Sequence, residues 1–143
     1  MSRLETEGFE ALARRFRKLQ IKTQGKMLGQ VANFGMTPVV SAAKRNAPVG
    51  KVAHKTHEGK LVAPGYGKRS IKKRMIRRKD GNGVSVIVGP ASDAYYLTQF
   101  VEIGTIKQPR QDWLLKSYRQ TKNTVEQRIA DRLGKKIEEQ AAR

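Results

Sequence analysis

Cysteine is missing from all 143 residues, which excludes disulfides, thiolate metal sites and cysteine nucleophiles. Aromatic residues make up only 6% of the chain, so its core must be small and mostly aliphatic. No segment approaches the roughly 20 apolar residues of a membrane span, and the N-terminus lacks an apolar export signal. We therefore expect one soluble domain over residues 1–143, with no membrane partner and no export by the general secretory route.

Acidic residues are also scarce, at 12 against 30 Lys and Arg, which gives a net charge of +18. Such a surplus favours a polyanion or acidic protein surfaces as partners. Residues 68–79 hold eight bases and no acid: Lys68, Arg69, Lys72, Lys73, Arg74, Arg77, Arg78 and Lys79. We expect this run to face DNA or a protein partner. A charge-guarded edge strand, a duplex-facing surface and a cavity lining all fit it.

Hydrophobic periodicity predicts an α+β fold, with N-terminal helices and a long C-terminal helix packed on a small antiparallel sheet. Residues 7–47 are predicted to be helical, with a kink or short break near Gly35 and Pro38. Residues 48–67 are rich in glycine and are predicted to form a long flexible loop. Residues 68–105 should form a β-hairpin and a short element. Residues 109–141 should hold the last helix, beginning at Trp113.

Turn and cap residues refine these elements. "SIKKRMIRR" and "VSVIVG" predict two strands joined by the turn "KDGNGV", with the second strand suited to the centre of a sheet. A short helix is predicted after an Asp93 cap and should end at Gly104, while Asp112 resembles the cap of the last helix. The predicted apolar stripe of that last helix is Leu114, Tyr118, Val125, Ile129, Leu133 and Ile137.

No catalytic, cofactor or metal site is predicted. His54, His57 and Glu58 lack a third ligand at a recognisable spacing. "PGYGK" lacks the spacing of a phosphate-binding loop, no serine stands in a nucleophile motif, and Glu102 has no second carboxylate or histidine implied nearby. We therefore expect a protein that is not an enzyme.

The window "YYLTQFVEIGT" carries one charge, Glu102, among apolar residues of an otherwise basic chain, and "QPRQDWLL" follows it. With the preceding "AP", the Gly-rich loop and "VIVGP", this order resembles the tail-completion (head–tail joining, or neck) proteins of long-tailed bacteriophages. The matching residues are Tyr96, Phe100, Val101, Glu102, Gly104, Thr105, Gln108 and Pro109. Departures are Ile103 in place of an aromatic residue, Arg110 and Trp113 at the helix entry, and a longer segment after "AP".

The resemblance implies a virion protein that is made in the host cytoplasm and placed at the neck or tail. Its copies would form a ring, commonly a hexamer, between the connector and the tail-tube or tail-terminator proteins, with genomic DNA held non-specifically in the lumen. Core and subunit interface would come from Tyr95, Tyr96, Leu97, Phe100, Val101, Glu102, Gly104, Thr105 and Trp113. Glu102 would accept backbone amides or pair with an arginine of another copy.

Two further classes stay open beside this one. Net charge alone would suit a stand-alone, non-specific nucleic-acid-binding protein, which should be a monomer or dimer that binds tightly at moderate salt. A metal-dependent nuclease would need ligands that the sequence does not offer, and a chelator would abolish its activity.

Overall fold

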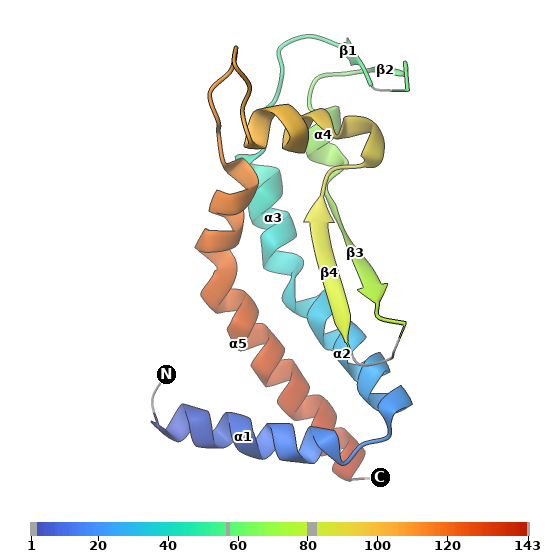
Figure 1. The fold of residues 1–143 in the computed structure, drawn as a ribbon, viewed down its shortest axis with the longest axis vertical. Coiled ribbons are helices and arrows are strands. Elements are labelled where there is room, and N and C mark those ends of the chain that lie inside the picture. The colour runs from blue at the N-terminus through green and yellow to red at the C-terminus, as the bar shows by residue number, and fades with distance from the viewer. Residues whose placement is uncertain (1–2, 57, 80–82, 143) are drawn as a thin grey trace.

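A computed structural model describes residues 3–56, 58–79 and 83–142. These residues form five α-helices and two antiparallel sheets of two strands each, so the chain has the predicted α+β fold. Helices α2 and α3 run beside the long helix α5, α1 crosses the lower end, and the β3–β4 hairpin covers the far side of α2 and α3 (Figure 1). The bounds are α1 Arg3–Arg17, α2 Ile21–Gly35, α3 Thr37–Asn46, β1 His54–Lys55, β2 Leu61–Val62, α4 Tyr66–Arg69, β3 Lys72–Arg77, β4 Val84–Gly89 and α5 Trp113–Ala141.

The predicted break in the N-terminal helical region lies between α2 and α3. Met36 separates the two helices, and Pro38 stands in the first turn of α3, where its missing amide hydrogen costs nothing. Gly35 serves a second purpose, because a side chain there would overlap Ile129 of α5. Ala47 is extended before Pro48 and ends α3, as the sequence indicated.

The buried face of α5 differs from the predicted stripe in its first half. Trp113, Ser117 and Thr121 are buried there, whereas Tyr118 is exposed. The hydroxyl of Ser117 donates to the carbonyl of Trp113 at 2.6 Å and accepts the side-chain amide of Asn46 at 2.9 Å. Small side chains thus face α3, whose Ala42 and Ala43 are fully buried. Farther along α5, Val125 and Ile137 are buried as predicted.

The predicted β3–β4 hairpin is confirmed, and its register pairs Lys73 with Val88 and Met75 with Val86. These side chains face α2, where Gly29 allows the sulfur of Met75 to approach closely. The opposite face leaves Ile76 and Ile87 about half exposed. The expectation of a central position for β4 was wrong, because its sheet has only two strands. Residues 80–82 of the predicted turn lie outside the described residues.

The segment predicted to be one long loop contains short regular elements. β1 and β2 pair antiparallel, and the buried Thr56 closes their turn by donating its amide to the carbonyl of Lys60 at 2.8 Å. Gly59 and Gly65 adopt positive φ, which supplies the turn and the entry into α4. Turn chemistry, rather than apolar content, creates these elements, so hydrophobic periodicity did not reveal them.

Two apolar clusters stabilise the elongated molecule. The lower cluster joins Met27 and Val31 of α2 to Ile137 of α5, and α1 covers it with Leu12 and Phe16. The upper cluster is built from Ala43, Ala47, Ile71, Leu97 and Trp113. The upper cluster brings the apolar window of the sequence against the start of α5.

Candidate functional site

The window identified in the sequence folds as a compact helical segment at the upper end of the molecule. A 3-10 turn η1 (Ser92–Ala94) leads into a π-helix η2 (Leu97–Glu102), and Gly104 follows with φ of 86°. The predicted short helix therefore exists, and it ends near Gly104. Asp93 does not cap it, because its carboxylate accepts the phenol hydrogen of Tyr66 at 2.6 Å instead.

Leu97 and Trp113 belong to the core of the subunit. Both are almost fully buried, and the indole Nε1 of Trp113 donates to the carbonyl of Leu97 at 3.0 Å. Gly67 of α4 lies so close to Leu97 that a side chain there would overlap it. Tyr96 and Val101 are half-buried and pack against the same cluster. These four candidate residues hold the segment to the fold.

Glu102 caps α5 from outside the helix. Its carboxylate accepts the backbone amides of Leu114 at 2.7 Å and Leu115 at 2.9 Å, which are the second and third amides of that helix. The expectation that Glu102 accepts backbone amides is confirmed, and they belong to a helix N-terminus that also favours a negative charge. Asp112 stands at the N-cap position, as predicted, but its side chain makes no capping bond and pairs with Arg110 instead.

Residues 103–112 form a projection that leaves the fold between η2 and α5 (Figure 1). Thr105 and Gln108 bridge across it with backbone bonds of 2.8 and 3.3 Å, and Gln111 donates to the carbonyl of Val101 at 3.1 Å at its base. Gly104 fits there because a side chain would meet the backbone nitrogen of Arg110 at 2.7 Å. The tip residue Ile106 is fully exposed. Residues 103–112 thus form a braced projection with an apolar tip.

Further apolar side chains are exposed on the segments of this upper end. Phe100 of η2 is 42% exposed and lies against Tyr95, with ring centroids 5.9 Å apart. Thr105 is also exposed, whereas Tyr95 is half-buried. Other exposed apolar residues on these segments are Val49, Val52, Leu61 and Ile103. Among the predicted interface residues, Phe100 and Thr105 are the ones that the fold leaves most accessible.

A cavity of about 370 Å³ opens beside the projection. Its apolar lining includes Pro48, Val49, Tyr96, Leu97 and Val101. On one wall, the hydroxyl of Tyr96 lies 2.5 Å from Nε2 of His54, and burial, followed by the charge of Asp93, raises the pKa of Tyr96. This polar pair braces β1 against η2 and leaves the cavity mostly apolar.

The predicted basic run does not form one surface. Lys68 and Arg69 lie on α4, while Lys72 and Arg74 point away from α2 on the outer face of β3. Lys73 points inward and donates to the carbonyl of Asn33 and the hydroxyl of Thr37. Burial, followed by the charge of Arg128, lowers the pKa of Lys73. The last residues, Arg77, Arg78 and Lys79, are exposed at the far end of the hairpin.

Arg77 and Arg78 line a second cavity, of about 180 Å³, together with Lys22 and Lys26 of α2. Sequence patterns do not reveal this cluster, because the two pairs of cations lie far apart along the chain. The exposed tip at Ile106 was missed for a different reason, since it stands within a short, turn-like stretch.

Metal-binding and membrane-spanning features are absent from the described part of the chain. Residues 3–56, 58–79 and 83–142 contain no group of three or more His, Asp or Glu that could hold a metal ion. His57, one of the histidines considered above, lies outside the described residues. None of the helices described combines the length and apolarity needed to cross a bilayer.

No family model, curated protein or solved structure matches this chain. The candidate functional features of the described residues are the braced projection, the apolar cavity beside it and the basic cavity at the other end of the molecule.

Proposed function

We propose that this chain is a structural subunit of a tailed bacteriophage particle, which joins copies of itself into a ring at the neck or tail end. The observation that carries the proposal is the braced projection of residues 103–112 with the fully exposed Ile106 at its tip. An isolated apolar tip held on a fixed support is suited to binding, because little conformational freedom is lost when it docks.

The tip and the apolar cavity are different surfaces of the same chain. Ile106 is fully exposed and therefore does not occupy the cavity of its own subunit, which is lined by Val49, Tyr96 and Val101. A contact between the tip of one copy and the cavity of the next is heterologous, and heterologous contacts close into rings when the rotation allows. Phe100, Ile103 and Val52 would add apolar area around that contact.

The resemblance of "FVEIGT" and "QP" to neck proteins supports the same assignment, because those residues form the projection and its base. It implies six copies, with the connector on one side of the ring and tail-tube or tail-terminator proteins on the other. Genomic DNA would cross the lumen, where the surplus of 18 positive charges would hold it without sequence preference. No step of this function requires catalysis or a cofactor.

The test replaces Ile106 with aspartate and compares it with Ile76→Asp, which places the same charge on an exposed isoleucine of β3. We expect both proteins to fold, as judged by circular dichroism. Ile106→Asp should abolish multimers in sedimentation velocity and tailed particles in electron micrographs of infected cells, and Ile76→Asp should preserve the multimers. Normal particles from Ile106→Asp would contradict the proposal.

The alternative is a stand-alone, non-specific nucleic-acid-binding protein. It predicts that neither variant changes the oligomeric state, that the wild-type chain is a monomer or dimer, and that it binds DNA tightly at moderate salt. The basic cavity at the lower end is the observation that keeps this candidate in the comparison.

A further inference from the structure

The basic cavity lies at the lower end of the molecule, between the first turns of α2 and the end of the β3–β4 hairpin at which Arg77 pairs with Val84. Lys22 and Lys26 stand one helical turn apart on α2, while Arg77 ends β3 and Arg78 follows it. Gly25, Gly83 and Val84 complete the lining. Because the two glycines have no side chains, they leave the cavity open, with a volume of about 180 Å³. We propose that this cavity receives a phosphate of the backbone of double-stranded DNA.

The packing of the hairpin on α2 places these four cations together. Gly29 lets β3 approach α2, and a guanidinium nitrogen of Arg77 lies 3.9 Å from the position that a side-chain carbon of Gly29 would occupy. The backbone of Arg78 is held at this end of the hairpin, since its amide donates to the carbonyl of Gly83 at 2.9 Å. The site is therefore built by a defined contact between α2 and the hairpin.

The described lining of the cavity contains no counter-charge, and Asp80 of the hairpin turn lies outside the described residues. That lining holds four cations and no carboxylate, and no described residue forms an ion pair with any of the four. Like charges gathered in one place repel, so an anion bound among them gains attraction and also relieves that repulsion. Arginine offers a planar fork that matches phosphate oxygens, and lysine adds a mobile point charge.

The lining also indicates which anion fits. It contains no aromatic side chain on which an unstacked base could lie, so recognition of single strands by stacking is disfavoured. Val84 is the one large apolar side chain of the described lining, which is too little for the apolar core of a protein interface. What remains is contact with the phosphate backbone, which fixes position and reads no sequence.

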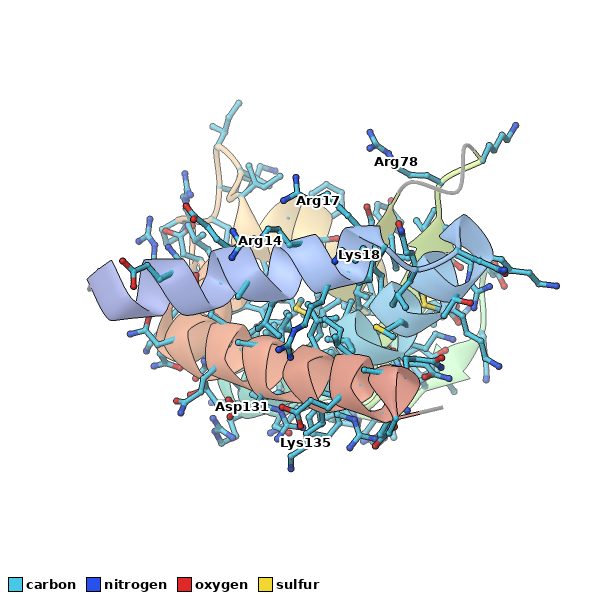
Figure 2. The ribbon with its side chains drawn as sticks, turned by 90° about the horizontal axis from the view of Figure 1, so that it is seen from below. Arg14, Arg17, Lys18, Arg78, Asp131 and Lys135 are labelled. Atoms are coloured by element: carbon cyan, nitrogen blue, oxygen red, sulfur yellow. The ribbon has the colours of Figure 1, made fainter. Side chains whose placement is uncertain are left out.

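Further cations lie on α1, which crosses the same lower end of the molecule (Figure 1). Figure 2 shows Arg14, Arg17 and Lys18 along α1, and Asp131 and Lys135 on α5. The choice of duplex DNA as the polyanion rests on the proposed function, whereas the cavity itself does not.

The experiment measures binding of a labelled duplex of about 30 base pairs, roughly three helical turns, to the full chain by fluorescence anisotropy over a series of salt concentrations. The double variant Lys26→Gln/Arg77→Gln removes one cation from each wall of the cavity. Its matched control, Lys116→Gln/Arg119→Gln, removes the same charge from exposed positions on the upper part of α5. Circular dichroism melting confirms that each variant is folded.

We expect the cavity variant to bind about 10-fold more weakly, equally for two unrelated sequences. The slope of log affinity against log salt should flatten by about 1 for each phosphate that the variant no longer neutralises. The control should change both quantities far less. Equal losses in the two variants would show that binding follows net charge alone and would overturn the proposal. Competition by poly-glutamate as strong as competition by unlabelled duplex would also overturn it, in favour of an acidic protein partner.

The two proposals can fail separately. If the cavity variant binds DNA as the wild type does and assembly still depends on Ile106, the phosphate-site proposal is refuted and the ring proposal stands. If Ile106→Asp gives normal particles and DNA binding still depends on the cavity residues, the ring proposal is refuted and the phosphate-site proposal stands.

Discussion

Glu102 caps helix α5 by accepting the backbone amide of Leu114 at 2.7 Å, although the two residues lie on opposite sides of the projection. The same carboxylate accepts the amide of Leu115 at 2.9 Å. One side chain therefore closes the base of residues 103–112 and satisfies two amides that a helix start leaves without partners. The lone acid of the apolar window is a structural anchor.

The first prediction concerns this anchor. Replacing Glu102 with alanine should lower the free energy of unfolding by about 1–2 kcal/mol, because two helix amides lose their acceptor and the helix dipole loses a negative charge. Glu102→Gln should cost less, since an acceptor oxygen remains. Urea unfolding followed by circular dichroism measures both. A Glu102→Ala protein as stable as the wild type would show that water replaces the carboxylate without cost.

The second prediction concerns Gly104. Its φ of 86° and the nearby backbone of Arg110 exclude a side chain, so Gly104→Ala should destabilise the protein by about 1–3 kcal/mol. The matched control is Gly8→Ala within α1, where nothing lies near the added carbon. Gly8→Ala should stabilise the fold by about 0.5–1 kcal/mol. Thermal melting distinguishes them, and shifts of the same sign would count against the strain argument.

The third prediction follows from the buried polar face of α5. Ser117 is fully shielded from solvent and holds Asn46, so Ser117→Ala should cost about 1 kcal/mol through the missing hydrogen bonds. Ser117→Leu should cost about 1–3 kcal/mol, because the larger side chain must force α3 away from α5. Chemical denaturation measures both. A Ser117→Leu protein more stable than the wild type would indicate that a leucine side chain fits between α3 and α5 without displacing them.

The fourth prediction concerns alkaline pH. The hydrogen bond to Asp93, with a smaller part from burial, raises the pKa of Tyr66 above its ordinary value of 10.0, so the folded state favours the neutral phenol. The stability from this bond is complete below the unfolded-state pKa and is lost as the pH rises through the folded-state pKa. The stability difference between wild type and Tyr66→Phe should therefore shrink above a pH of about 10.

Asp93→Asn provides the control for that experiment. It removes the carboxylate that raises the pKa of Tyr66 while keeping the phenol. The difference in unfolding free energy between Asp93→Asn and Tyr66→Phe should therefore depend less on pH than the difference between the wild type and Tyr66→Phe. Urea titrations at a series of pH values from neutral to alkaline give these differences. The prediction is contradicted if the stability difference between the wild type and Tyr66→Phe increases with pH.

Much of the fold could be read from the sequence because local patterns governed it. The β-branched run Val84–Val88 and its basic partner strand predicted the hairpin, and Pro38 marked the break between α2 and α3. The expectation that Glu102 accepts backbone amides also followed from chemistry, since a carboxylate in an apolar window needs donors.

Other features depended on contacts between distant segments. Ser117 and Thr121 look like solvent-facing residues, and only the close approach of α3 makes them core. Asp93 and Asp112 resemble helix caps, but Asp93 binds Tyr66 instead. Asp112 does stand at the N-cap position of α5, yet the side chain of Glu102 accepts the helix amides. The basic cavity forms only because β3 packs on α2, and the periodicity of neither segment predicts this packing.

The way the projection is fastened determines how it responds to load. A pull on the tip near Ile106 passes along covalent backbone to Glu102 on one side and to Trp113 on the other, and these two residues are tied to α5 and to Leu97. Force applied at the tip therefore acts first on the backbone bonds that close the base of the projection, from Gln111 to Val101 and from Asp112 to Glu102. Detaching the projection from the fold would require breaking the bonds of Glu102 to the first turn of α5, and so would begin to unfold that helix.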